Sequence, residues 1–281
     1  MTVILLGIGL PWLTAHFYYE LSRHIPPYIS WAWVDAFGWL AIITTQWIAV
    51  GILLRIMGGS IRIAMIGSGR WLEADSLVKI LAILVLTGIS LDYLWQLPWF
   101  SVFPDRLIDL SAPTSQNFSD EDIVHLGPAL TTTLLMLTAG PIAEEIVYRA
   151  VVLRALVAVM PVAWAIASSS LLFGLFHLDD PLAAICFSAI LCLVYLQTGS
   201  LLSCIALHIA YNCLVALSEL LTIVFPDNWY RSYDTFRVEA WWLHATILTV
   251  SAALAFDLAR RLRISKFEMR DFGTGNSHRT P

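Results

Sequence analysis

The stretch PLAAICFSAILCLVYLQTGSLLSCIALHIAYNCLVALS, residues 181–218, contains no Asp, Glu, Lys or Arg. A helix needs about 20 consecutive apolar residues to cross a bilayer, so this stretch is long enough for two crossings. The polar sequence Gln197–Ser200 divides the stretch near its middle and contains a glycine, which predicts a turn. We therefore expect two consecutive membrane helices here.

Similar uncharged stretches recur along the whole chain. Of its 281 residues, 58% are hydrophobic and only 13% are charged, with a mean hydropathy of +0.74. Soluble domains carry about 25% charged residues, so a soluble protein is excluded. A net charge of −5 without a basic stripe argues against nucleic-acid binding. We expect an all-α, polytopic transmembrane bundle of about eight spans: 1–19, 36–54, 76–104, 123–143, 155–178, two within 181–218, and 240–256.

Charges between the spans predict the orientation of the chain. The 55–79 loop and the tail after Arg260 are rich in Arg and Lys, whereas the 105–122 loop is rich in Asp and Glu. The positive-inside rule then places both termini on the cytoplasmic side of the membrane. We expect this to be a cell membrane, that is, the plasma membrane or the inner membrane. The first span lacks a basic start and a clear cleavage site, so we expect a retained anchor helix. The expected regions are N-terminal helices 1–120, a core 121–225, and a last helix with a basic tail, 226–281.

Two adjacent carboxylates lie in the apolar sequence Pro141–Arg149. Charged groups inside a membrane are costly and are functional candidates by default. Glu145 and Arg149 have the spacing of a helical ion pair, whereas Glu144 has Tyr148 at that spacing and no cation. We expect Arg149 to hold Glu145 and Glu144 to face a cavity as a general base. The alternative is a surface ion pair at the cytoplasmic end of a helix.

Polar residues also occur in two other apolar segments. His177 ends the fifth expected span, and His208 and Asn212, four residues apart, project from one face of the seventh. A single histidine in such a helix is more often a structural, hydrogen-bonded residue. Glu144 and His177 are each 16 residues from the predicted turn at Met160–Pro161. An antiparallel pair of helices would therefore place both at the same depth.

These residue types suit hydrolysis by an activated water molecule. The chain has no GxSxG or HExxH motif and no Ser-His-Asp order, so water is the expected attacking group. Glu144 would take the proton of that water, and His177 would orient it. His208 and Asn212 would donate hydrogen bonds to the oxyanion of the tetrahedral intermediate. The expected reaction is hydrolysis of an amide within or beside the bilayer.

The three motifs together resemble those of a known family. Glu144-Glu145-xxx-Arg149, Phe173-xxx-His177 and His208-xxx-Asn212 match, in order, the EExxxR, FxxxH and HxxxN/B motifs of the CPBP intramembrane glutamic endopeptidases, which include the Rce1-type CaaX prenyl proteases. The similarity covers about residues 120–225. It implies a multi-pass membrane protease whose substrate is a membrane-associated protein or peptide.

The resemblance also implies residue roles. Glu144 would be the base, Glu145 and Arg149 would support it, His177 would be a second catalytic group, and His208 with Asn212 would form the oxyanion hole. We expect no cofactor, and zinc bound by the Glu and His residues is the alternative, since catalytic zinc accepts such ligands.

Several alternatives stay open at this stage. One is a non-catalytic binding or immunity module of the same fold. Another is a proton-coupled transporter, although the sequence shows no internal repeat of the kind common in transporters. The candidate substrates are prenylated CaaX proteins, bacteriocin precursors and proteins with C-terminal sorting tags. The lipid bilayer is the other expected partner, and no nucleic acid is expected.

Overall fold

Helices make up all the regular structure that the described part of the chain contains. The computed structural model describes residues 9–22, 24, 31–57, 71–102, 126–177, 180–224 and 241–261. Most of the predicted 55–79 loop, the acidic 105–122 loop and the basic tail after Arg261 lie outside these residues. The predicted orientation in the membrane, which depends on those charges, therefore stays a prediction.

Each expected span overlaps a helix among the described residues, which confirms the all-α polytopic bundle. Residues 1–8 of the first expected span lie outside the described residues. The helical segments α8 to α10, with the π-helical segments η2 and η3 between them, form one continuous helix. The elements are α2 (Leu10–Ser22), α3 (Trp31–Met57), α5 (Ala74–Val102), α8 (Leu126–Leu134), η2 (Leu135–Ala139), α9 (Gly140–Glu145), η3 (Ile146–Leu153), α10 (Arg154–Val157), α11 (Val162–Gly174), α12 (Pro181–Thr198), α13 (Leu201–Val224) and α15 (Trp241–Arg261).

Within the described residues, five helices are long and apolar enough to cross a membrane: Ala36–Leu53, Ala74–Leu94, Leu130–Val157, Pro181–Thr198 and Leu201–Ser218. The expected span 155–178 is wrong in its extent, because residues up to Val157 belong to the preceding helix and α11 has only 13 residues. At 1.5 Å per residue, α11 is about 20 Å long, whereas the hydrocarbon core is about 30 Å thick.

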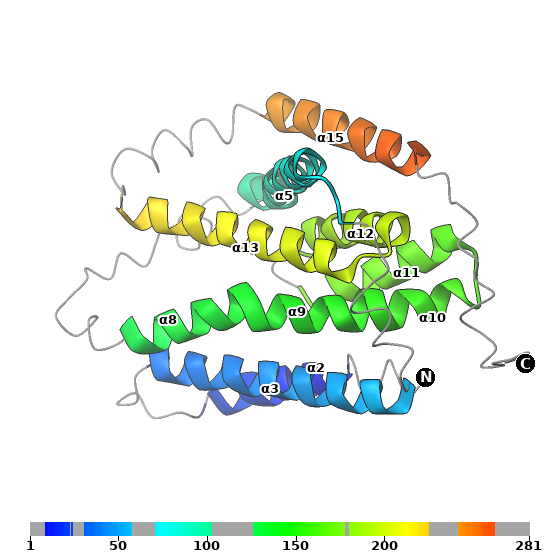
Figure 1. Cartoon of the computed structure of the whole chain (residues 1–281). Helices are drawn as coiled ribbons and strands as arrows, with labels where there is room; N and C mark the ends of the chain where they lie inside the picture. The colour runs from blue at the N-terminus through cyan, green and yellow to red at the C-terminus, as the bar shows by residue number, and fades with distance from the viewer. Residues whose placement is uncertain are drawn as a thin grey trace, which may run out of the picture.

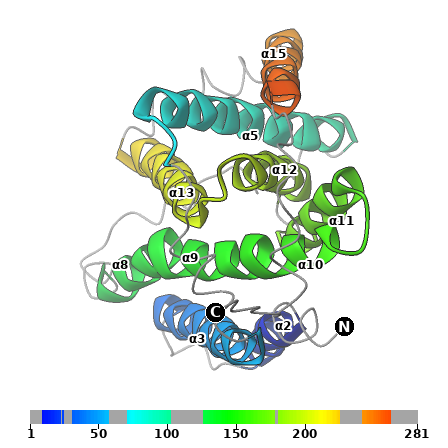
Figure 2. The same ribbon diagram turned by 45° about the vertical axis from the view of Figure 1, so that its right-hand side comes forward.

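The helices are stacked in layers (Figures 1 and 2). The pair α2 and α3 lies on one side of the continuous helix α8–α10, and α11, α12 and α13 lie on its other side. Helix α5 covers α12 and α13, and α15 packs on the outer side of α5. The helix that carries the two glutamates is therefore enclosed between α3 and the α11–α13 layer.

The turns around α12 follow from local sequence. Gly199 ends α12 with a φ of 64°, a left-handed conformation that glycine adopts without steric penalty. This confirms the turn predicted at Gln197–Ser200. At the other end, Asp180 Oδ1 accepts a hydrogen bond from the Ala183 N–H at 3.2 Å, and Pro181 occupies the first turn. Burial raises the pKa of this half-buried Asp180 to about 6.

The long helix α8–α10 passes through Gly140–Pro141 without reversing its direction. The proline is accommodated because the preceding turn is π-helical: the Gly140 N–H donates to Leu135 O, five residues back. A second π-helical segment, η3, follows Glu145 directly, and all of its residues are buried. The continuous helix is thus π-helical on both sides of the glutamates, a feature that the sequence pattern did not predict.

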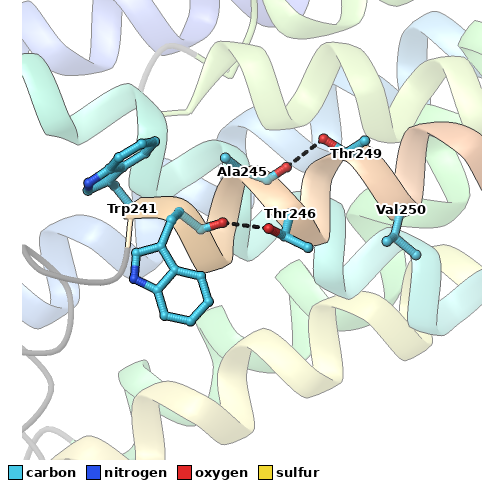
Figure 3. A pocket seen from close by; sticks show the side chains of 6 residues that line it. Trp241, Ala245, Thr246, Thr249 and Val250 are labelled. Carbon is cyan, nitrogen blue, oxygen red and sulfur yellow. Dashed lines mark hydrogen bonds between the residues drawn. The ribbon is translucent and has the colours of Figure 1, made fainter.

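A groove lies on α15, and neither glutamate is among its lining residues (Figure 3). Its volume is about 370 Å³, and it is lined by Trp241, Trp242, Ala245, Thr246, Thr249 and Val250. The hydroxyls of Thr246 and Thr249 donate to carbonyls of their own helix, both at 2.7 Å, as the dashed lines show. The groove therefore presents mainly methyl groups and indole rings, and we do not include it in the candidate site.

Candidate active site

Glu145 and Arg149 form an ion pair inside the protein. Arg149 Nη1 lies 3.0 Å from Glu145 Oε1, and both side chains have 0% exposure. The other guanidinium nitrogen, Nη2, donates to Ser188 of α12, at 3.3 Å to Oγ and 3.5 Å to the carbonyl O. The Phe173 ring lies 5.1 Å from the guanidinium carbon. The complete burial of both charges rules out the alternative of a surface ion pair.

His208 is held by the same carboxylate oxygen. Its Nδ1 lies 2.8 Å from Glu145 Oε1, so α13 is tied to the continuous helix at this point. With Glu145 ionised beside Arg149, Nδ1 is the donor of this hydrogen bond and carries a proton. In the neutral ring, Nε2 is then the unprotonated nitrogen, the atom that can accept a proton.

Glu144 faces His208 from the other side. Glu144 Oε2 lies 3.8 Å from His208 Nε2, and the Glu144 side chain retains 19% of its exposure. This separation is too long for a direct hydrogen bond. A water molecule that contacts both atoms would lie to one side of the line that joins them. The two adjacent glutamates thus have different environments, since Glu145 is sealed in an ion pair and Glu144 is partly accessible.

His177 occupies a separate position beside Phe173. Its Nδ1 donates to the Phe173 carbonyl at 2.9 Å, because a carbonyl can only accept, and its ring stacks on the Phe173 ring at 4.3 Å. The Phe173 ring lies 6.1 Å from the His208 ring. Among the contacts of the described residues, none joins His177 to Glu144 or Glu145. The pairing of Glu144 with His177 therefore stays a prediction.

Asn212 contacts the continuous helix from α13. Its Nδ2 donates to the carbonyl O of Met136 in η2 at 3.3 Å. The expected hydrogen bond from Asn212 to an oxyanion stays a prediction. One of the two amide hydrogens of Asn212 is already bonded within the protein. This contact was not expected from the sequence.

The sequence motifs do not include two further residues that lie beside the site, Ser188 and Phe187. Ser188 lies fully buried against Arg149, and its signal in the sequence is a lone polar residue within an apolar helix. Phe187 packs with its ring 4.8 Å from both His208 and Tyr211, a role that an apolar residue in an apolar helix does not reveal. Together with Phe173, these residues fix the positions of the charged groups.

A metal ion would have to share its ligands with other partners. Among the residues that the structure describes, no three His, Cys, Asp or Glu side chains are arranged to hold one. Glu145 Oε1 already contacts both Arg149 and His208. A guanidinium cation beside a carboxylate opposes the binding of a second cation there.

Comparison with known proteins identifies the segment that carries all six candidate residues. Residues 126–214 match the family model described as type II CAAX prenyl endopeptidase Rce1-like. This segment is Rce1-like. The match confirms the predicted resemblance to the CPBP family. No curated protein and no solved structure gives a significant match.

The match and the helices agree on the class of protein. Several apolar helices of membrane length indicate a multi-pass membrane protein. The Rce1-like match makes residues 126–214 similar to a family of CAAX-type proteases, which are peptide hydrolases. Both statements fit a site that is assembled from residues in the interior of a helical bundle.

Proposed function

We propose that this protein is an intramembrane endopeptidase that hydrolyses a peptide bond of a membrane-associated protein or peptide with water activated by Glu144. The observation that carries the proposal is the facing pair of Glu144 Oε2 and His208 Nε2, 3.8 Å apart, next to a fully buried Glu145–Arg149 pair. The Rce1-like match of the same segment supports it.

In this mechanism the two glutamates divide the work. Glu144, the more accessible carboxylate, accepts the proton of the attacking water, which is placed beside Glu144 Oε2 and His208 Nε2. Glu145 does not react; its Oε1 holds His208 Nδ1 and leaves Nε2 for the reacting groups. Arg149 balances the charge of Glu145 in the interior, where an unpaired carboxylate is strongly disfavoured.

The remaining residues act on the water and on the substrate carbonyl. The hydrogen bond from His177 Nδ1 to Phe173 leaves Nε2 of the neutral ring available, and we assign it the orientation of the water when substrate is bound. The second amide hydrogen of Asn212 and His208, once its Nε2 carries a proton, are the proposed donors to the oxyanion. The proposed mechanism uses no metal ion, because Glu145 is already engaged by Arg149 and His208.

The Glu144→Gln variant tests the proposal. The amide keeps the size of the side chain but cannot take a proton, so we expect a loss of rate of about 10²–10⁴-fold. The measurement is mass spectrometry of protein C-termini in membranes from cells with the wild-type chain, with the variant, and without the chain. Cleavage products that appear only with the wild type are then tested with the purified protein in liposomes.

The matched control is Glu73→Gln, which makes the same chemical change at an exposed glutamate before α5. We expect this variant to cleave like the wild type. If cells with Glu144→Gln and cells without the chain process every candidate substrate normally, the protein is a non-catalytic module. Uptake of a solute into sealed vesicles that depends on Glu144, without proteolysis, would instead indicate a transporter.

A further inference from the structure

The carbonyl of Met136 has lost the main-chain donors of its helix. In an α-helical register its donor is the N–H of Gly140, but that N–H bonds Leu135 O. In a π-helical register its donor is the N–H of the next residue, Pro141, and proline has none. The π-helical turn followed by proline thus exposes one acceptor, three residues after Thr133 and eight before Glu144.

Asn212 supplies a hydrogen bond to this acceptor. Its Nδ2 donates to Met136 O at 3.3 Å across the gap between α13 and the continuous helix. Met136 lies in the candidate span Leu130–Val157, where lipid offers no donor and unpaired main-chain groups are costly. The side chain of another helix therefore replaces the missing N–H.

This hydrogen bond joins the two helices that carry Glu144 and His208. Pro141 precedes Glu144 by three residues, about one helical turn, and Asn212 follows His208 by four. The contact therefore joins the two helices about one turn from His208 on α13 and about two turns from Glu144 on the continuous helix. A change in this contact moves one reacting group relative to the other.

We propose that Asn212 is a positioning residue whose amide replaces the N–H that Pro141 lacks and thereby sets the distance between Glu144 and His208. The inference deepens the proposed function and rests on it for the activity measurement only. It assigns one amide hydrogen of Asn212 to Met136, and the second hydrogen stays free to contact the substrate.

A double-mutant cycle of Pro141→Ala and Asn212→Ala tests the proposal, because alanine at 141 restores a main-chain N–H. In the wild-type background, Asn212→Ala should lower the melting temperature in detergent by about 2–4 °C. It should lower kcat by about tenfold, with KM little changed. In the Pro141→Ala background the loss of melting temperature should largely disappear, since the carbonyl then has its own donor. The loss of kcat should become smaller but should not vanish, because the contact of Asn212 with the oxyanion is still missing.

The outcomes separate this inference from the proposed function. An equal loss of melting temperature in both backgrounds, or no loss in either, overturns the capping role of Asn212. A melting temperature that is rescued while kcat is not shows that Asn212 acts on the substrate and overturns the positioning role. If the wild-type protein cleaves nothing, the proposed function fails, but the melting temperatures still decide the capping role.

A second measurement keeps the test decisive if Pro141→Ala does not fold. The carbonyl ¹³C signal of Met136, in protein labelled at methionine carbonyls and assigned with Met136→Leu, should shift in Asn212→Leu. It should not shift in the control Ser218→Ala, whose hydroxyl on the same helix donates only to Val215 O. An unchanged Met136 signal in Asn212→Leu overturns the proposal.

Discussion

At the scale of single residues, one oxygen atom organises the site. Glu145 Oε1 contacts Arg149 at 3.0 Å and His208 at 2.8 Å, so a single buried carboxylate fixes a cation and an imidazole from two different helices. Arg149 is itself held by Ser188. The orientation of His208 therefore depends on a chain of contacts that ends in an uncharged serine of α12.

Ser188→Ala tests this chain. The variant removes the Oγ acceptor of Arg149 Nη2, and hydrogen bonds to charged groups contribute about 1.5–3 kcal/mol. We expect a lower free energy of unfolding by an amount in this range and a reduced kcat with an unchanged KM, both measured in detergent. Ser169→Ala is the matched control, because this equally buried hydroxyl bonds Tyr148 O and not Arg149. Equal effects of the two variants would contradict the chain.

The sequence predicted the ion pair at this scale but not the partners of the histidines. The spacing of Glu145 and Arg149 is a local property of a helix, so it could be read directly. His208 is 63 residues from Glu145, and its approach depends on how α13 packs on the continuous helix. For the same reason the sequence alone could not show that His208, and not His177, faces Glu144.

At the scale of helices, the ends of α12 follow local rules whereas the length of α11 does not. A glycine and an Asp-Pro pair mark the ends of α12 in the sequence as in the structure. No charged residue lies between α10 and α11, so Pro161 is the sequence signal for the boundary between these two helices. The uncharged stretch therefore put the start of this span too early, whereas the turn predicted at Met160–Pro161 is confirmed between α10 and α11.

Asp180 makes the stability of the α12 N-terminus depend on pH. Burial raises its pKa from the ordinary 3.8 to about 6, so the folded chain retains the proton to higher pH than the unfolded chain. Between about pH 4 and pH 6 the folded state binds more protons, and this group makes the protein less stable as the pH rises. Above about pH 6 the full destabilisation is present.

Asp180→Asn should remove this dependence, because asparagine keeps a capping oxygen without a titratable group. The difference in melting temperature between variant and wild type should be small near pH 4 and should grow in favour of the variant toward pH 7. Asp180→Ala removes the cap as well, so its difference from Asp180→Asn should be constant over this range. Parallel curves for wild type and Asp180→Asn would show that Asp180 does not titrate there.

At the scale of the whole molecule, the packing of surrounding helices helps to position the residues of the site. Helix α5 lies against α13, and Gly88 of α5 is in contact with the Tyr211 hydroxyl, where no room remains for a Cβ atom. Tyr211 follows His208 by three residues on α13. The packing of α5, outside the Rce1-like segment, therefore bears on the position of His208.

Gly88→Ala should push α13 away from α5. Overpacking of this kind typically destabilises a protein by about 1–3 kcal/mol, and we also expect a lower kcat. Tyr211→Phe removes the hydroxyl that an alanine Cβ would meet, so the double variant should recover stability relative to Gly88→Ala. Unfolding in denaturant and cleavage rates measure both effects. Simple additivity of the two changes would contradict a direct clash.

The π-helical turn η2 in the continuous helix α8–α10 predicts the effect of deleting one residue there. Each π-type hydrogen bond closes a loop one residue larger than an α-type bond does, so η2 accommodates a surplus residue within an otherwise regular helix. Deletion of one residue between Leu135 and Ala139 would make this turn α-helical, with Glu144 keeping its orientation. Pro141 would then clash with the carbonyl four residues before it. The surplus residue thus frees a carbonyl without being needed to aim the carboxylate.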